Sequence, residues 1–128
     1  MKLPWAFELV DRRPFTFAGI WEKGNEARPP SFSILTTSPN ELVGRIHNRM
    51  PVMLSDDDAR RWVAPGALTK ESLAPFVRPY PADRMCSYRV NSALNSVRND
   101  TAEAAAPANT DDQPARPDSA VAGQGELF

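Results

Sequence analysis

Two side chains that lie two positions apart could carry chemistry: His47 and Arg49, in the segment Ile46-His47-Asn48-Arg49. An imidazole can take up and release a proton near neutral pH, and the planar guanidinium fork of arginine suits phosphate oxygens. The residues alone leave two other interpretations open. A histidine at the end of a short helix can bond the last carbonyls, and an exposed arginine can form a surface salt bridge.

The only cysteine, Cys86, lies in an apolar run beside Met85, with no neighbouring histidine to activate its thiol. We therefore expect Cys86 to be structural. One cysteine and one histidine cannot build an internal disulfide or a zinc site made of these residue types. We expect neither a metal nor another cofactor.

A separate signal is the segment Gln124-Gly125-Glu126-Leu127-Phe128, which fits the Gln-x-x-Leu-Phe pattern of short peptides that dock on the bacterial sliding clamp. Gln124 could hydrogen-bond, while Leu127 and Phe128 could fill an apolar pocket. From residue 101 onward the chain is rich in alanine, proline and acidic residues, and its few large apolar side chains cannot offset the entropy of ordering. We predict a disordered tail over residues 101–128 that carries this peptide, although short motifs also recur by chance.

The elements that must position these residues are predicted from the patterning of residues 1–100. Two apolar runs, 5–10 and 15–21, flank the turn sequence Asp11-Arg12-Arg13-Pro14 and predict a β-hairpin. Alternation over 31–37 predicts another strand. Two further strands are predicted over the apolar runs 51–54 and 85–90.

Three helix starts accompany these strands. Ser38-Pro39-Asn40-Glu41 combines an N-cap, a proline at the first helical position and a capping-box glutamate, which predicts a helix that ends near His47. Ser55 and the three aspartates that follow predict a second helix, and Thr69 opens a short third one. The fold class is therefore α+β, with a β-rich mixed sheet or barrel-like domain and short helices.

Length and composition limit the classes that remain. The 128 residues fit one small domain, and 41% hydrophobic and 24% charged residues are typical of globular proteins. Without an apolar run of about 20 residues or a secretory signal, we expect no membrane span and a cytoplasmic location. Residues 1–100 carry fourteen Lys and Arg against eleven Asp and Glu, a mild excess that is compatible with nucleic-acid binding. Trp5, Phe17 and Trp21 could stack on unpaired bases, but core packing is the favoured interpretation.

Three segments in register resemble the SOS-response-associated peptidase family of abasic-site processing proteins. They are Phe17-Ala18-Gly19-Ile20-Trp21-Glu22, Phe32-Ser33-Ile34-Leu35-Thr36-Thr37-Ser38-Pro39-Asn40 and Ile46-His47-Asn48-Arg49-Met50-Pro51-Val52. Segments 88–91 and 97–100 are similar to the family's closing part, so residues 1–100 correspond to the C-terminal portion of its domain. The resemblance implies that His47 is the catalytic histidine and that Arg49 contacts the DNA backbone.

The resemblance also implies a role in the DNA damage (SOS) response. The family forms a covalent protein–DNA linkage at an abasic site in single-stranded DNA, through the amine and thiol of an N-terminal cysteine at position 2. It also has autopeptidase and lyase activities. Position 2 of this chain is Lys2. The family's N-terminal half, with a DNA-contacting arginine and asparagine and a catalytic glutamate, has no counterpart in the sequence, so we expect the chain alone to be inactive.

Several interpretations stay open at this point. The chain could be a gene fragment, the product of a misplaced start codon, or a remnant that pairs with a separately encoded N-terminal half. A second hypothesis, from another class, is a non-enzymatic module that binds single-stranded DNA and the sliding clamp. In a third, half of a β-rich domain exposes its sheet edges and does not fold stably.

Overall fold

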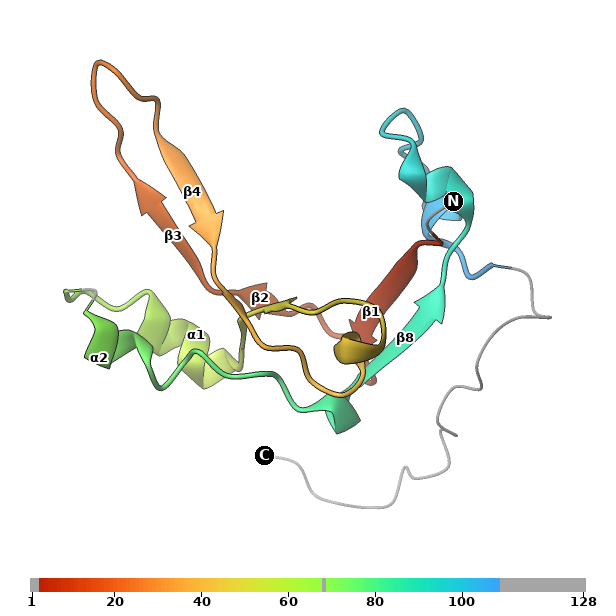
Figure 1. Ribbon diagram of the computed structural model, residues 1–128, viewed down its shortest axis with the longest axis horizontal. Helices are drawn as coiled ribbons and strands as arrows, with labels where there is room; N and C mark the ends of the chain where they lie inside the picture. The colour runs from red at the N-terminus through yellow and green to blue at the C-terminus, as the bar shows by residue number, and fades with distance from the viewer. Residues whose placement is uncertain (1–2, 68, 109–128) are drawn as a thin grey trace. The chain divides into compact units, whose positions relative to one another are not determined.

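The computed structural model describes residues 3–67 and 69–108 (Figure 1). These residues form short strands and a few short helices, so the predicted α+β fold class is confirmed. They divide into two compact units: residues 11–84 form one, and the described residues among 1–10 and 85–128 form the other. No helix in the described part of the chain is long and apolar enough to cross a membrane.

The unit that contains the start of the chain is built on one antiparallel strand pair. β1 (Trp5–Leu9) pairs with β8 (Met85–Arg89), from Trp5 opposite Arg89 to Leu9 opposite Met85. Leu9 and Met85 are buried, as is Val90, whose backbone N–H donates to the Pro4 carbonyl at 3.1 Å. The predicted strand over 85–90 is confirmed.

The predicted hairpin between 5–10 and 15–21 is wrong, because β1 takes β8 as its partner. The turn itself forms. The Asp11 carboxylate accepts hydrogen bonds from the Arg13 backbone N–H at 3.0 Å and from Arg13 Nε at 2.8 Å, and these bonds hold the pKa of Asp11 below its ordinary value. Arg12 adopts a positive φ of 59°. Two apolar runs beside a turn predict strands, but they do not fix which strands pair.

In residues 11–84, three chain segments each contribute two short strands. Each segment pairs one of its strands with each of the other two segments. The pairs are β2 (Thr16–Phe17) with β7 (Met53–Leu54), β3 (Gly19–Glu22) with β4 (Ser31–Ile34), and β5 (Thr36–Thr37) with β6 (Met50–Pro51). The predicted strands over 31–37 and 51–54 are therefore confirmed, each interrupted by one residue.

The three interrupting residues, Ala18, Leu35 and Val52, form a closed ring of backbone hydrogen bonds, which we call the three-way junction. The N–H of Ala18 donates to the Val52 carbonyl at 2.9 Å, that of Val52 to the Leu35 carbonyl at 2.8 Å, and that of Leu35 to the Ala18 carbonyl at 2.9 Å. Ala18 and Val52 are fully buried and pack with Leu54 and Phe76. The junction thus lies in the core of this unit.

Two predicted helices are confirmed. α1 (Asp56–Trp62) begins after Ser55, whose hydroxyl accepts a hydrogen bond from the Asp58 backbone N–H at 3.2 Å. α2 (Lys70–Leu73) begins after Thr69, which forms a capping box with Ser72. In both cases the side chain at the cap satisfies backbone N–H groups that the first helical turn leaves without partners.

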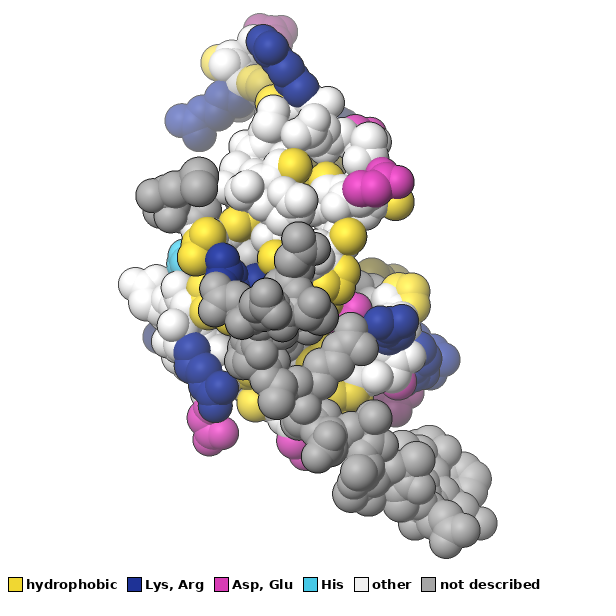
Figure 2. All heavy atoms as spheres, turned by 90° about the vertical axis from the view of Figure 1, so that its right-hand side faces the viewer, with side chains coloured by type: hydrophobic (Ala, Val, Ile, Leu, Met, Phe, Trp, Pro, Cys, Tyr) yellow, Lys and Arg dark blue, Asp and Glu magenta, His cyan; other side chains and the backbone are white. Residues whose placement is uncertain are grey.

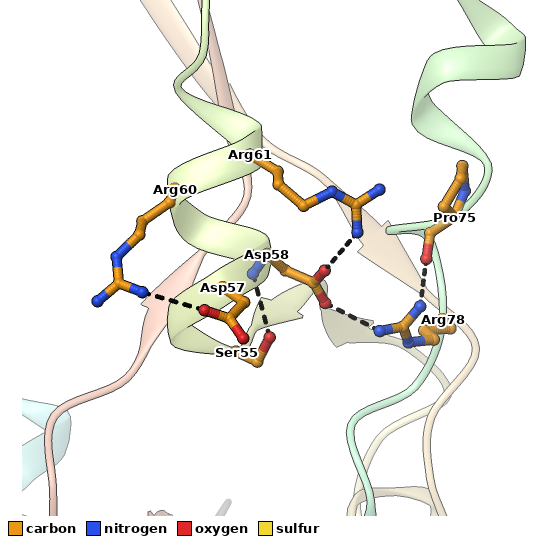
Figure 3. Close-up of polar contacts among 7 residues, drawn as sticks. All are labelled: Ser55, Asp57, Asp58, Arg60, Arg61, Pro75 and Arg78. Atoms are coloured by element: carbon orange, nitrogen blue, oxygen red, sulfur yellow. Dashed lines mark hydrogen bonds and ion pairs between the residues drawn. The ribbon is translucent and has the colours of Figure 1, made fainter. Parts of the chain in front are cut away.

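A buried carboxylate ties α1 to the segment that follows α2 (Figure 3). Asp58 is 9% exposed, and one of its oxygens accepts from Arg61 at 3.2 Å while the other accepts from Arg78 at 2.8 Å. Arg78 also donates to the Pro75 carbonyl, and the Arg61 guanidinium lies 5.1 Å from the centre of the Phe76 ring. These contacts hold Phe76 against the core, where its ring meets Trp62 edge to face.

The predicted helix from Ser38 to His47 is wrong at its start. Only the short 3-10 helix η1 (Val43–Arg45) forms. The side chain of Asn40 accepts from the Val43 N–H at 2.9 Å and donates to the Tyr80 carbonyl at 2.7 Å, so Asn40 begins the turn and Ser38 does not. The predicted end is confirmed, because the N–H of His47 donates to the Val43 carbonyl at 2.9 Å.

Of the predicted tail over residues 101–128, the structure describes residues 101–108. They include a 3-10 helix, η4 (Ala102–Ala105), in which Ala104 is buried, and a β-bridge joins Pro107 to Val90. Residues 109–128 lie outside the described residues, and with them the predicted clamp-binding residues Gln124, Leu127 and Phe128.

Candidate nucleic-acid site

His47 lies just after η1 with an exposed side chain, and its ring is held by the backbone of Arg49. Nδ1 of His47 lies 3.1 Å from the backbone nitrogen of Arg49 and 3.0 Å from its carbonyl oxygen. In one tautomer Nδ1 accepts from that N–H, and in the other it donates to that carbonyl. Because Nδ1 has a partner on Arg49 in either form, Nε2 is the ring nitrogen that these contacts leave available.

The Arg49 side chain is fixed on a single residue of β5. Its Nε donates to Thr36 Oγ1 at 3.2 Å, and its Nη2 donates to Thr36 Oγ1 at 2.9 Å and to the Thr36 carbonyl at 2.8 Å. These bonds set the plane of the guanidinium. They do not involve Nη1, whose two N–H groups can therefore donate to a phosphate oxygen.

The strand pairing explains why Thr36 and Arg49 meet. β5 and β6 run antiparallel, with Thr36 opposite Pro51 and Thr37 opposite Met50. Continued by one residue, this register sets Arg49 opposite Ser38, diagonal to Thr36 and on the same side of the strand pair. Thr37, the next residue in β5, points the other way and is 6% exposed. The sequence therefore supplies an arginine, but the cross-strand threonine decides where its guanidinium lies.

Sequence reasoning missed Thr36 and Asn40 as positioning residues. In the alternating run 31–37, Thr36 shares a face with the apolar Phe32 and Ile34, so alternation alone places its hydroxyl on the side expected to be buried. Asn40 lies three residues before Val43, a spacing typical of an asparagine that caps a helical turn. These local signals predict a cap at Asn40, but they predict neither the exposure of Thr36 nor the contacts with Arg49 and Tyr80.

Cys86 lies within β8, where it is partly buried and its thiol donates to Glu8 Oε1 at 3.6 Å. Among the aromatic residues considered for base stacking, Trp5 is partly buried in β1 and Phe17 is 42% exposed. Trp21 is 73% exposed, so core packing is the wrong interpretation for this residue. The reason is that Trp21 lies in a strand pair whose residues are all exposed.

Within residues 3–67 and 69–108, no group of three His, Cys, Asp or Glu side chains could hold a metal ion. His47 and Arg49 both have exposed side chains, so they lie on an open surface and not in an enclosed pocket. The arrangement can therefore bind an anionic group at Arg49 and exchange a proton at His47 on an open surface.

Comparisons with known proteins agree on one family. The family model described as SOS response associated peptidase (SRAP) matches residues 1–97. The abasic site processing protein YoqW of Bacillus subtilis is 40% identical over 105 residues, which cover 80% of this chain and 47% of YoqW. The abasic site processing protein HMCES of Gallus gallus is 34% identical over 100 residues, which cover 74% of this chain and 29% of HMCES.

A solved structure supports the same grouping. The crystal structure of a protein from Bacteroides thetaiotaomicron superposes with a TM-score of 0.70 at 26% identity, covering 85% of this chain and 50% of that protein. The chain thus spans about half the length of the Bacillus and Bacteroides relatives it matches. The resemblance found in the sequence is confirmed: this chain belongs to the SOS response associated peptidase family.

Proposed function

We propose that this chain acts in the processing of abasic sites in single-stranded DNA and supplies the histidine and arginine of the site. The observation that carries the proposal is that Arg49 has two tasks: its backbone holds the His47 ring, and its guanidinium is fixed on Thr36. The relatives YoqW and HMCES, both named abasic site processing proteins, support it.

In the proposed reaction the ring-opened abasic site presents an aldehyde to a cysteine that carries a free amine and a free thiol. The amine adds to the aldehyde carbon, water leaves to give an imine, and the thiol then adds across the C=N bond to close a thiazolidine. His47 Nε2 gives a proton to the departing hydroxyl and receives one as the thiol adds. Arg49 Nη1 holds a neighbouring phosphate, so that the strand stays in place between these steps.

The nucleophile in this proposal is not one of residues 1–128, because position 2 is Lys2 and the single cysteine is in β8. A segment equivalent to the other half of the relatives would supply it, either on a longer polypeptide or as a separate chain. With residues 1–128 alone, we expect DNA binding without a covalent product.

The first test incubates the purified chain with a single-stranded oligonucleotide that bears one abasic site and then looks for a shifted band on a denaturing gel. We expect no such band. A stable band that disappears in the His47→Ala variant would mean that another amine or Cys86 acts as nucleophile, and would contradict the expected inactivity.

The second test measures non-covalent binding of the same oligonucleotide by fluorescence anisotropy at fixed salt. Loss of one phosphate contact in Arg49→Ala should weaken binding by about 3- to 10-fold and reduce its salt dependence. Arg60→Ala is the matched control, because Arg60 is also exposed but its guanidinium pairs with Asp57 at 3.0 Å. Equal weakening in both variants would contradict a specific role for Arg49.

The proton-transfer role needs a third test, in which crosslinking is restored by adding a polypeptide that carries the missing cysteine. His47→Gln should then slow crosslinking by about 100-fold while leaving oligonucleotide affinity unchanged. A parallel loss of affinity and rate would instead indicate that His47 only shapes the binding surface.

We propose as a second function that residues 124–128 bind the bacterial sliding clamp, on the strength of the Gln-x-x-Leu-Phe pattern. Replacing both Leu127 and Phe128 by alanine should abolish capture of the chain on immobilised clamp. Gly125→Ala, at a position where the pattern is not selective, is the control. Capture that is indifferent to the double substitution would remove this proposal.

A further inference from the structure

The β3–β4 hairpin exposes a large apolar surface. All residues of both strands are exposed, and Trp21 lies directly opposite Phe32. Ile34 is two residues from Phe32 and therefore shares its face of the hairpin. Trp21 is 73% exposed, Phe32 76% and Ile34 44%. We call these three residues the hairpin face. Figure 2, which views the molecule from the right-hand side of Figure 1, shows that other hydrophobic side chains reach the surface among charged and polar ones.

The edge of β3 that faces away from β4 is contacted by a side chain of α1. The Gly19 carbonyl accepts a hydrogen bond from Trp62 Nε1 at 3.0 Å, so this carbonyl points away from the main-chain partner strand. Backbone groups alternate in direction along a strand, and those of Trp21 therefore face the same edge. Trp21 thus offers an N–H and a carbonyl to a further strand.

An open groove of about 490 Å³ runs beside this edge, between β3 and the end of α1. Its apolar lining includes Phe17, Ile20, Trp62 and Val63, and Val63 is 79% exposed. An extended peptide that pairs with Trp21 would place alternate side chains into this groove. The surface therefore combines backbone groups for pairing with a pocket for apolar side chains.

The charges argue against nucleic acid as the occupant of this surface. Lys23 and Arg28, in the loop that joins β3 to β4, are balanced by Glu22 and Glu26. Binding of single-stranded DNA to aromatic side chains normally relies on a positive groove that follows the phosphates. An apolar polypeptide strand fits the balanced charges better.

The lengths of the relatives indicate where such a strand comes from. Matches with YoqW and with the Bacteroides protein cover 47% and 50% of those chains, so each has as much again beyond the matched part. The sheets of the described residues contain only two strands each, and isolated two-stranded sheets are marginally stable. We propose that the hairpin face and the free edge of β3 bind the half of the SRAP fold that residues 1–128 do not match, through strand addition beside Trp21.

The proposal rests on family membership and surface geometry, and it is tested without DNA. The chain of residues 1–128 is titrated by calorimetry with a polypeptide made of the part of YoqW outside the 105-residue match. We expect binding, and slower hydrogen exchange at the Trp21 amide once the complex forms. No binding, together with unchanged exchange at Trp21 when the same segment is fused to the chain by a flexible linker, would overturn the proposal.

A pair of matched substitutions locates the interface. Trp21→Arg should weaken the association by about 10-fold or more, whereas Val97→Arg, at a fully exposed position of the other unit, should leave it unchanged. Circular dichroism of each variant alone checks that folding is retained. Equal affinities of the two variants would overturn the proposed surface.

Two other occupants give distinguishable results, and either would overturn the proposal. A concentration-dependent dimer of the chain alone that Trp21→Arg abolishes would show that a second copy covers the hairpin face. A loss of oligonucleotide affinity in Trp21→Arg would show that DNA bases do. His47→Ala should not affect association with the YoqW segment, so failure of the proposed chemistry and failure of this interface are separable.

Discussion

The β3–β4 hairpin is built from two of the three chain segments that form the three-way junction, but the two regions differ in burial. Ala18 and Val52 in the junction are fully buried, whereas every residue of β3 and β4 is exposed. In the junction each of three segments bonds to the other two, and the core residues Leu54 and Phe76 cover it. The hairpin has one strand pair and no third strand among the described residues. Buried apolar residues therefore stabilise the junction, whereas the exposed apolar residues of the hairpin are available to a partner.

The candidate site depends on the junction and not on the hairpin. β5 begins directly after Leu35, and β6 ends directly before Val52. The pairing of these two strands places Thr36 beside Arg49. A change in the junction should therefore disturb both stability and the site. A change in the hairpin face should disturb neither in the isolated chain.

The largest expected effect is on the junction. Val52→Asp would place a carboxylate where the side chain is fully buried, which should destabilise the chain by more than about 3 kcal/mol and remove its cooperative unfolding transition. Urea denaturation followed by circular dichroism measures this. Val97→Asp is the control at a fully exposed valine, and equal midpoints for the two variants would contradict the junction's role.

A smaller loss is expected when the buried carboxylate beside the core is neutralised. Asp58→Asn keeps the side-chain shape but weakens its bonds to Arg61 and Arg78, so it should cost about 1–2 kcal/mol. Asp57→Asn removes an exposed ion pair with Arg60 and should change stability by less than about 0.5 kcal/mol. Thermal unfolding of both variants gives the comparison. Similar values would mean that burial of Asp58 adds nothing.

Thr36→Val tests whether the junction acts on the site through one hydroxyl. The valine removes two of the three hydrogen bonds that fix the Arg49 guanidinium and leaves the one to the Thr36 carbonyl. We expect oligonucleotide affinity to fall by about 3-fold, with stability unchanged within about 0.5 kcal/mol because Thr36 is exposed. Anisotropy titration checks this, and an unchanged affinity would show that Arg49 needs no anchor.

The smallest effect is expected at the hairpin face. Trp21→Ser should change the stability of the isolated chain by less than about 0.5 kcal/mol, because the side chain is 73% exposed. The same urea experiment measures it. A loss as large as that in Val52→Asp would mean that the hairpin belongs to the core, as the junction does.

Much of the local structure could be predicted from particular residues. Ser55 before three aspartates and Thr69 before Ser72 place α1 and α2 correctly, since caps act on backbone groups only a few residues away. The strand over 85–90 follows from its apolar run. The start of η1 was missed because Asn40 offers the backbone a bond that competes with a helix begun at Ser38.

The sequence by itself determined the family, through motifs in register, and the positions of most strands and helix caps. It also identified His47 and Arg49 as candidates. Only the tertiary structure decided that β1 pairs with β8, that Ala18, Leu35 and Val52 close a ring, and that Thr36 anchors Arg49. The physical reason is that strand pairing joins residues far apart in the chain, so an apolar pattern predicts a strand without naming its partner.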